Sequence, residues 1–106
     1  MLVADLARHV ETAHTGVQAL QIAKKFRPQL VLLDLGLPRM DGYEVARRLR
    51  AEPETTYAVI AAVTGYGQSS DRQRTREAGF DEHLVKPVSH ATLKALLGAA
   101  ARRPGR

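Results

Sequence analysis

The fold of this chain is decided by one stretch of sequence, LVLLDLG at residues 30–36. Four aliphatic residues in succession are typical of a strand that is buried on both faces, as in a parallel sheet. Asp34 ends this run, and Gly36 opens the loop that follows. Ligands of open α/β sheets bind outside the carboxyl ends of the strands. A carboxylate at that edge can be a metal ligand, a general base or a nucleophile that accepts a phosphoryl group.

Short β-branched runs alternate with helical stretches along the rest of the chain, which predicts a parallel sheet covered by helices. Thr15 and Asp41 are suited to cap two helices, because each precedes a glutamine or glutamate by three residues. Val17, Leu20 and Ala23 are expected to share the inner face of the first of these helices. The strands are predicted at residues 9–13, 30–34, 58–63 and 82–85, and the helices at residues 15–26, from 41 onward, 70–79 and 89–102.

Three predicted strands end in a polar residue next to a turn: Asp34, Thr64 and Lys86. Because parallel strands present their carboxyl ends at one edge of the sheet, these three side chains are expected to converge. Such a set suits phosphoryl transfer, in which the carboxylate attacks phosphorus. The hydroxyl of Thr64 would donate to a phosphoryl oxygen, and the ammonium of Lys86 would neutralise the added charge.

The ordered set of motifs resembles the receiver domain of bacterial two-component response regulators. The matching sequences are VLLD at residues 31–34, LPRMDGYE at 37–44, VTG at 63–65, AGFD at 78–81 and LVKP at 84–87. The resemblance covers residues 9–101 and implies an α/β, flavodoxin-like (CheY-like) fold with helices on both faces of the sheet and strand order 2-1-3-4-5. It also implies a phosphorelay signalling module of the bacterial cytoplasm, not an enzyme.

The resemblance assigns a role to each residue at this edge of the sheet. Asp34 is expected to accept a phosphoryl group from a histidine kinase or a phosphotransfer protein, and partner binding is expected to switch as a result. Mg²⁺ is the expected cofactor, with Asp34 and Gly36 as metal ligands, and Gly65 is the candidate cofactor-binding residue. Thr64 and His83 are the candidate switch residues.

The chain departs from this family at its start. In receiver domains a pair of acidic residues ends the first strand and holds the Mg²⁺, and no such pair is found here. A parallel crossover needs roughly a dozen residues, whereas only residues 5–8 separate the first four residues from the strand expected at residue 9. Residues 1–8 are therefore predicted to be the remainder of the first helix, so that the domain is N-terminally truncated and lacks the first strand.

The missing strand belongs in the middle of the sheet, where buried backbone groups left unpaired cost about 1–3 kcal/mol each. Three outcomes are open: a changed strand order, a homodimer formed by strand pairing or swapping, or instability of the isolated chain. Self-association is the outcome that we favour. Without the acidic pair, Asp34 and the Gly36 carbonyl are poor Mg²⁺ ligands, so we expect weak or absent phosphorylation.

Two other functions compete with that of a phosphoacceptor. A phosphorylation-incompetent, receiver-like domain for interaction or dimerisation is the alternative that the missing acidic pair favours. A phosphohydrolase of the haloacid-dehalogenase type also attacks from an aspartate at a strand end. That class requires a second aspartate where this chain has Gly36, so it is disfavoured.

The composition is that of a single domain spanning all 106 residues, with a loose tail at residues 103–106. The chain has no cysteine, which excludes disulfides and cysteine-ligated metals. No apolar run approaches the length of a membrane span, so no membrane partner is expected. The formal net charge of +5 is spread over several segments with interleaved acids, which favours solvated helix faces over direct binding to nucleic acid.

Overall fold

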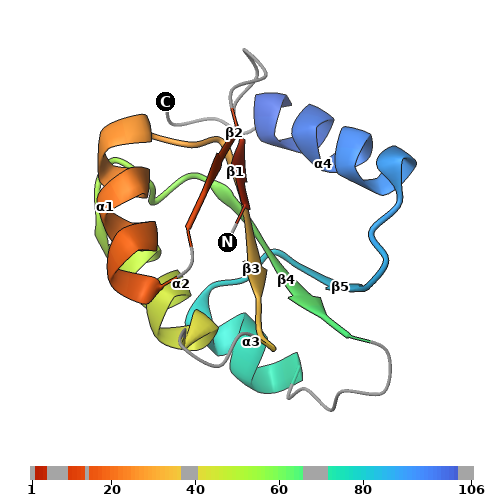
Figure 1. Ribbon diagram of the computed structural model, residues 1–106, viewed down its shortest axis with the longest axis horizontal. Coiled ribbons are helices and arrows are strands. Elements are labelled where there is room, and N and C mark those ends of the chain that lie inside the picture. Colours follow the sequence, from red (N-terminus) through yellow and green to blue (C-terminus); the bar gives the residue numbers. More distant parts are fainter. Residues whose placement is uncertain (1, 5–9, 14, 37–40, 66–71, 103–106) are drawn as a thin grey trace.

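The computed structural model describes residues 2–4, 10–13, 15–36, 41–65 and 72–102. Within these ranges the chain forms five strands and four helices (Figure 1). In chain order the elements are β1 (Leu2–Ala4), β2 (Val10–Thr12), α1 (Gly16–Phe26), β3 (Leu30–Asp34), α2 (Gly42–Ala51), β4 (Val59–Thr64), α3 (Arg72–Ala78), β5 (Glu82–Val85) and α4 (His90–Arg102).

Strands β3, β4 and β5 form the parallel part of the sheet, as the sequence predicts. β3 pairs with β4 along its whole length and ends with Asp34 opposite Val63. β4 pairs in turn with β5, and Thr64 lies opposite Val85. The carboxyl ends of these three strands therefore lie at one edge of the sheet, and the predicted α/β fold is confirmed.

Strand β1 corrects the prediction for the start of the chain. Residues 2–4 form a strand, not the remainder of a helix, and this strand lies between β2 and β3. It runs antiparallel to both neighbours, with Leu2 opposite Leu32 and Ala4 opposite Leu30. Antiparallel strands can be joined by a short connection, so the chain-length argument, which assumed a parallel crossover, does not apply.

The sheet has the strand order that the resemblance implies, so the possibility of a changed strand order is wrong, whereas the homodimer and the instability of the isolated chain stay predictions. Its order is β2-β1-β3-β4-β5, so the chain's own β1 occupies the central place that was expected to be empty. Pairing of β1 with β3 needs no second copy of the chain, and self-association stays a prediction. The predictions for residues 1 and 5–8, and for the tail at 103–106, lie outside the described residues.

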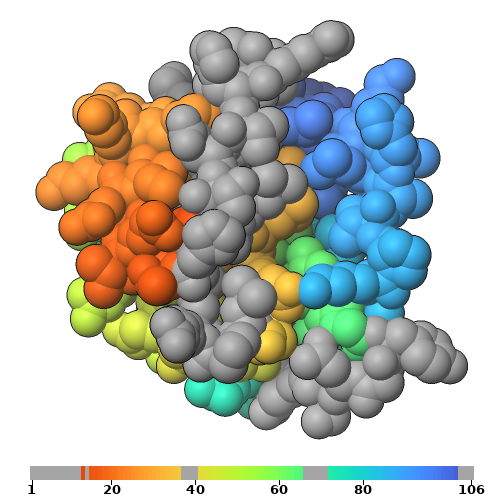
Figure 2. All heavy atoms as spheres, viewed as in Figure 1, coloured from red at the N-terminus to blue at the C-terminus, as the bar shows by residue number. Residues whose placement is uncertain are grey.

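The sheet separates two hydrophobic cores. Successive residues of a strand face opposite sides, so Val31 and Leu33 pack with buried residues of α1, α2 and α3, whereas Leu30 and Leu32 pack with Leu96 of α4. Among the described elements, three helices thus cover one face of the sheet and α4 covers the other (Figure 1). In the space-filling view, α1 and α4 form opposite flanks of the molecule (Figure 2).

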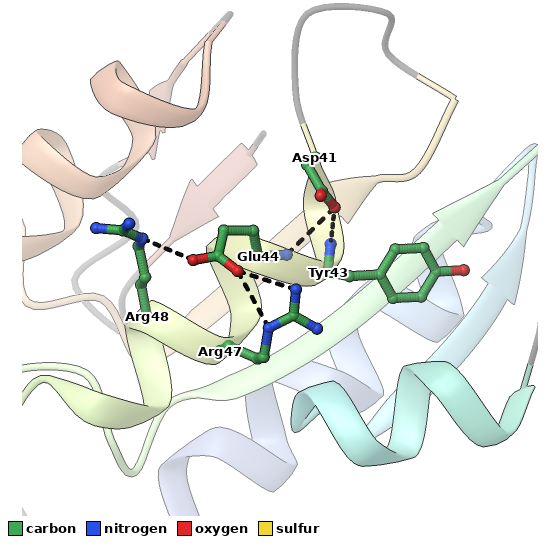
Figure 3. Close-up of polar contacts among 5 residues, drawn as sticks. All are labelled: Asp41, Tyr43, Glu44, Arg47 and Arg48. Atoms are coloured by element: carbon green, nitrogen blue, oxygen red, sulfur yellow. Dashed lines mark hydrogen bonds and ion pairs between the residues drawn. The ribbon is translucent and has the colours of Figure 1, made fainter.

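Side-chain caps fix where two of the helices begin. Oγ1 of Thr15 accepts a hydrogen bond from the N–H of Gln18 at 3.1 Å. Oδ1 of Asp41 accepts from the N–H groups of Tyr43 and Glu44 at 3.1 and 3.3 Å (Figure 3). Both predicted caps are confirmed, and each satisfies backbone donors that the first turn of a helix leaves unpaired.

The inner face of α1 is centred on two small residues. Ala19 and Ala23 are fully buried, and Leu20 packs against the same core. Val17 was expected on this face, but it is 69% exposed, so that part of the prediction is wrong. Residues two positions apart in a helix point about 200° away from each other around its axis. Because Ala19 faces the core, Val17 therefore faces solvent.

One arginine joins three segments that surround the sheet. The side chain of Arg50, on α2, pairs with Asp81 at 2.5 Å and donates to the carbonyls of Thr56, Ala58 and Gly79 at 2.9, 2.6 and 2.9 Å. Asp81 also accepts from the backbone N–H of β4 residue Ile60 at 2.8 Å, through the same Oδ2. The two charged side chains are only 22% and 24% exposed, so their contacts are poorly screened by solvent.

Replacing Arg50 with alanine is expected to destabilise the fold, because Asp81 loses its cationic partner and three carbonyls lose the donor that Arg50 supplies. The free energy of unfolding should fall by about 2–4 kcal/mol, measured by urea denaturation. Arg48→Ala on the same helix is the matched control, since the Arg48 side chain is 63% exposed and should matter far less. Equal losses for the two variants would contradict the structural role assigned to Arg50.

Candidate functional site

The backbone brings the predicted site residues to one edge of the sheet. Asp34 is the last residue of β3, and the N–H of the next residue, Leu35, donates to the Val63 carbonyl at 2.9 Å. Thr64 is the last residue of β4, and its carbonyl accepts from the N–H of Lys86 at 2.7 Å. The peptide bond between Lys86 and the proline that follows is cis.

Asp34 and Lys86 are in direct contact. The ammonium of Lys86 forms an ion pair with Oδ2 of Asp34. Oδ1 of the same carboxylate accepts from the N–H of Gly36 at 2.8 Å. The Asp34 side chain is 19% exposed, whereas that of Lys86 is 51% exposed, so the carboxylate is the more buried member of the pair.

Opposing effects act on the ionisation of Asp34. Partial burial by itself raises the pKa of this carboxyl. The hydrogen bonds from Lys86 and from the N–H of Gly36, together with the positive charge of Lys86, outweigh burial and hold the pKa below its ordinary value of 3.8. Asp34 is therefore a carboxylate at neutral pH, which is the form that a nucleophile or a metal ligand requires.

Thr64 makes its side-chain contacts with β5. Its hydroxyl donates to the carbonyl of Leu84 at 3.4 Å, and Oγ1 lies 3.4 Å from Nε2 of His83. The hydroxyl thus belongs to the same strand edge as Asp34, but its hydrogen-bond partners lie on β5 and do not include the carboxylate. Gly65 follows Thr64 directly and is partly buried.

His83 has a pKa below its ordinary value of 6.5. Burial of the ring is the larger cause, and the positive charge of Arg72 on α3 adds to it. At neutral pH the imidazole is therefore uncharged. Sequence reasoning singled out His83 as a switch residue, but the neighbourhood of Arg72, eleven residues earlier in the chain, could not be read from spacing.

The described residues do not fit a magnesium site. Mg²⁺ prefers octahedral oxygen coordination that includes carboxylates, yet both oxygens of Asp34 are already engaged, by Lys86 and by Gly36. No group of three or more histidine, aspartate or glutamate residues within the described ranges could hold a metal ion. The antiparallel β1 ends with Ala4 opposite Leu30, at the far end of β3 from Asp34. The carboxyl end of β1 therefore lies at the edge of the sheet opposite to the one that holds Asp34.

The ion pair at Asp34 predicts how stability depends on pH. Because the pKa of Asp34 is lower in the folded chain, the pair contributes stability above about pH 3.8, and this contribution disappears as pH falls through the folded pKa. The difference in free energy of unfolding between the natural chain and Asp34→Asn should be constant at higher pH and shrink on acidification below that value. A difference that grows on acidification would contradict the lowered pKa.

The comparisons with known proteins agree with this geometry. The family model of the response regulator receiver domain matches residues 1–98. The polar-differentiation response regulators DivK of Brucella anthropi and Brucella ovis are 35% and 34% identical to this chain over 96 residues. In both cases the match covers 85% of this chain and 78% of the relative.

Solved structures give the same result. A putative response regulator from Chloroflexus aurantiacus matches with a TM-score of 0.71 and 32% identity, over 85% of this chain and 75% of that one. The receiver domain of the sensor histidine kinase PA1611 from Pseudomonas aeruginosa matches with a TM-score of 0.69 and 32% identity, over 82% of this chain and 71% of that one. That structure has a magnesium ion coordinated in its active-site cleft. The chain therefore belongs to the response regulator receiver domain family of two-component signalling.

Proposed function

We propose that Asp34 is the phosphoacceptor of this receiver domain, and that a histidine kinase or a phosphotransfer protein is the donor. The contact between Asp34 and Lys86 carries this proposal, because it joins an ionised nucleophile to the cation that would balance a phosphoryl group. Thr64 at the end of the neighbouring strand supplies a hydroxyl at the same edge of the sheet.

The proposed transfer uses the residues in simple roles. A carboxylate oxygen of Asp34 attacks phosphorus, and the P–N bond of a phosphohistidine breaks with its electron pair going to the departing imidazole. Lys86 then pairs with a phosphoryl oxygen, and its charge offsets part of the charge that the phosphoryl group brings. The hydroxyl of Thr64 would leave the carbonyl of Leu84 and donate to another phosphoryl oxygen, which would alter contacts at β5 and so switch partner binding.

The same contacts predict that transfer is slow. Charge compensation at Asp34 comes from one ammonium that is half exposed, since the described residues do not fit Mg²⁺. A phosphoryl donor carries negative charge, so it is repelled by Asp34 when no divalent cation balances both groups. We therefore expect little phosphorylated protein at steady state.

A second function is favoured by the engagement of both Asp34 oxygens. In this alternative the chain keeps the receiver fold and acts as an interaction or dimerisation domain, without accepting a phosphoryl group. The ion pair would then be a fixed part of the fold, and partner binding would not depend on a kinase.

A phosphorylation assay with acetyl phosphate separates the two functions. For the phosphoacceptor we expect weak, acid-labile incorporation that is lost in Asp34→Asn, reduced in Lys86→Met, and little changed by adding Mg²⁺ or EDTA. The measurement is intact-protein mass spectrometry after timed incubation. Asp41→Asn is the matched control, because Asp41 caps α2 and has no role in the proposed transfer.

Each other outcome of this assay has a definite meaning. If no phosphoryl group is incorporated with or without Mg²⁺, the phosphoacceptor proposal fails and the interaction domain replaces it. Rapid incorporation that depends strictly on Mg²⁺ would contradict the conclusion that the described residues do not fit the metal.

A further inference from the structure

Strand β5 carries Lys86 at its end, yet side-chain packing does little to hold this strand in register. It is four residues long and lies at the edge of the sheet, where, among the described strands, it pairs with β4 (Figure 1). Its first and last residues, Glu82 and Val85, are exposed, and the two between them are only partly buried. A strand without a well-buried face has a weakly specified register. The register of β5 therefore depends on contacts at the two ends of the strand.

The residue that precedes β5, Asp81, is anchored to β4 at two points. Its backbone N–H donates to the carbonyl of Ile60 at 2.7 Å, and its Oδ2 accepts from the N–H of Ile60 at 2.8 Å. Both backbone groups of one β4 residue are thus bonded to one residue at the entry to β5. A slip of one residue would move Asp81 about 3.3 Å along β4 and break both bonds.

Arg50 holds the carboxylate of Asp81 in this orientation. Its Nη2 pairs at 2.5 Å with the same Oδ2 that accepts from Ile60. The guanidinium also donates to backbone carbonyls on either side of it, those of Thr56, Ala58 and Gly79. Because a guanidinium is planar and its donors have fixed directions, these bonds leave it one position. We refer to Arg50 and Asp81 together as the clamp.

The turn before Asp81 leaves room for the clamp. Gly79 has a φ of +103°, a conformation that residues with a side chain rarely adopt. A Cβ atom at this position would lie 2.7 Å from Cγ of Arg50, so the stem of Arg50 occupies the space beside the glycine. The backbone is therefore shaped around Arg50 just before the chain enters β5.

The opposite end of β5 leads directly into the Asp34 site. The backbone N–H of Lys86 donates to the carbonyl of Thr64 at 2.7 Å, and its ammonium pairs with Asp34. Asp81 and Lys86 thus flank the same short strand. A slip of β5 by one residue would carry Lys86 about 3.3 Å along β4 and turn the side chains of β5 to the other face of the sheet. The Asp34–Lys86 pair would not survive such a slip.

We propose that Arg50 and Asp81 are positioning residues for the Asp34 site, because they hold the register of β5 and thereby place the ammonium of Lys86 against the carboxylate. They act through the strand, from its start, and Lys86 follows its end. This inference rests on the role proposed for Lys86 as the cation of the site. It predicts that a change before β5 alters the ionisation of a carboxylate beyond the other end of the strand.

The test measures the pKa of Asp34 in Asp81→Ala and Arg50→Met, by NMR titration of the Asp34 side-chain carbonyl carbon. Loss of the contact with Lys86 removes an effect that lowers this pKa, so both variants should raise it in the same direction as Lys86→Met. Asp81→Ala is the sharper variant, because it removes a negative charge and direct electrostatics would then lower the pKa of Asp34. A rise in Asp81→Ala therefore reports displacement of Lys86.

The register is measured in the same samples by nuclear Overhauser effects between neighbouring strands. Those between Thr64 and Val85 should weaken in both variants. Those between Asp34 and Val63 should persist, because β3 and β4 are held by buried side chains. Asp81→Asn keeps an acceptor for the N–H of β4 and should restore part of the natural behaviour.

Two control variants on α2 separate the clamp from charge and from stability. Arg48→Met removes a positive charge from an exposed position, and Val45→Ala removes buried methyl groups and lowers the free energy of unfolding. Neither should change the pKa of Asp34. A rise in Val45→Ala equal to that in Asp81→Ala would overturn the proposal, because it would show a general loosening of the fold.

An unchanged or lowered pKa of Asp34 in Asp81→Ala would also overturn the proposal, and Asp81 would then serve stability alone. If Asp81→Ala and Arg50→Met do not fold, Asp81→Asn decides by the same criterion. None of these measurements uses a phosphoryl donor, so the clamp and the phosphoacceptor can fail separately.

Discussion

Parallel pairing of β3 with β4 and of β4 with β5 is the constraint on which the rest of the site depends. The register sets Asp34 opposite Val63 and Thr64 opposite Val85. A shift of one residue in either pairing would turn these side chains to the other face of the sheet. The backbone bond from Lys86 to the Thr64 carbonyl fixes where the chain leaves β5, and from that point the ammonium reaches Asp34. The hydrophobic runs that set the pairing of these strands therefore also set which side chains meet at their carboxyl ends.

The direction of a strand decides which of its ends lies at the functional edge. β1 fills the centre of the sheet and pairs with both neighbours, so it meets the need for backbone hydrogen bonds. Because it is antiparallel, its last residue, Ala4, lies opposite Leu30 and not beside Asp34. β1 therefore completes the backbone pairing in the centre of the sheet. The described residues at the functional edge nevertheless form no group that could hold a metal ion. Lys86 becomes the main source of positive charge for Asp34.

The sequence was a good guide wherever a local rule fixes the structure. The aliphatic run before Asp34 and the caps at Thr15 and Asp41 depend on neighbouring residues, and all three were correctly predicted. The strand at residues 2–4 was not predicted, because the argument from chain length assumed a parallel crossover, whereas this strand pairs with both neighbours in the antiparallel direction. Convergence of Asp34 and Lys86 followed from parallel topology, whereas the influence of Arg72 on His83 could not be read from their spacing in the sequence.

The central claim is that Lys86 holds Asp34 as a carboxylate in place of a metal ion. The most direct measurement is the NMR titration of the Asp34 side-chain carbonyl carbon in the natural chain and in Lys86→Met. The account predicts a pKa below 3.8 in the natural chain, a clear rise in Lys86→Met, and no change on adding Mg²⁺ to the natural chain. A pKa that does not respond to loss of Lys86, or that falls only when Mg²⁺ is added, would contradict it.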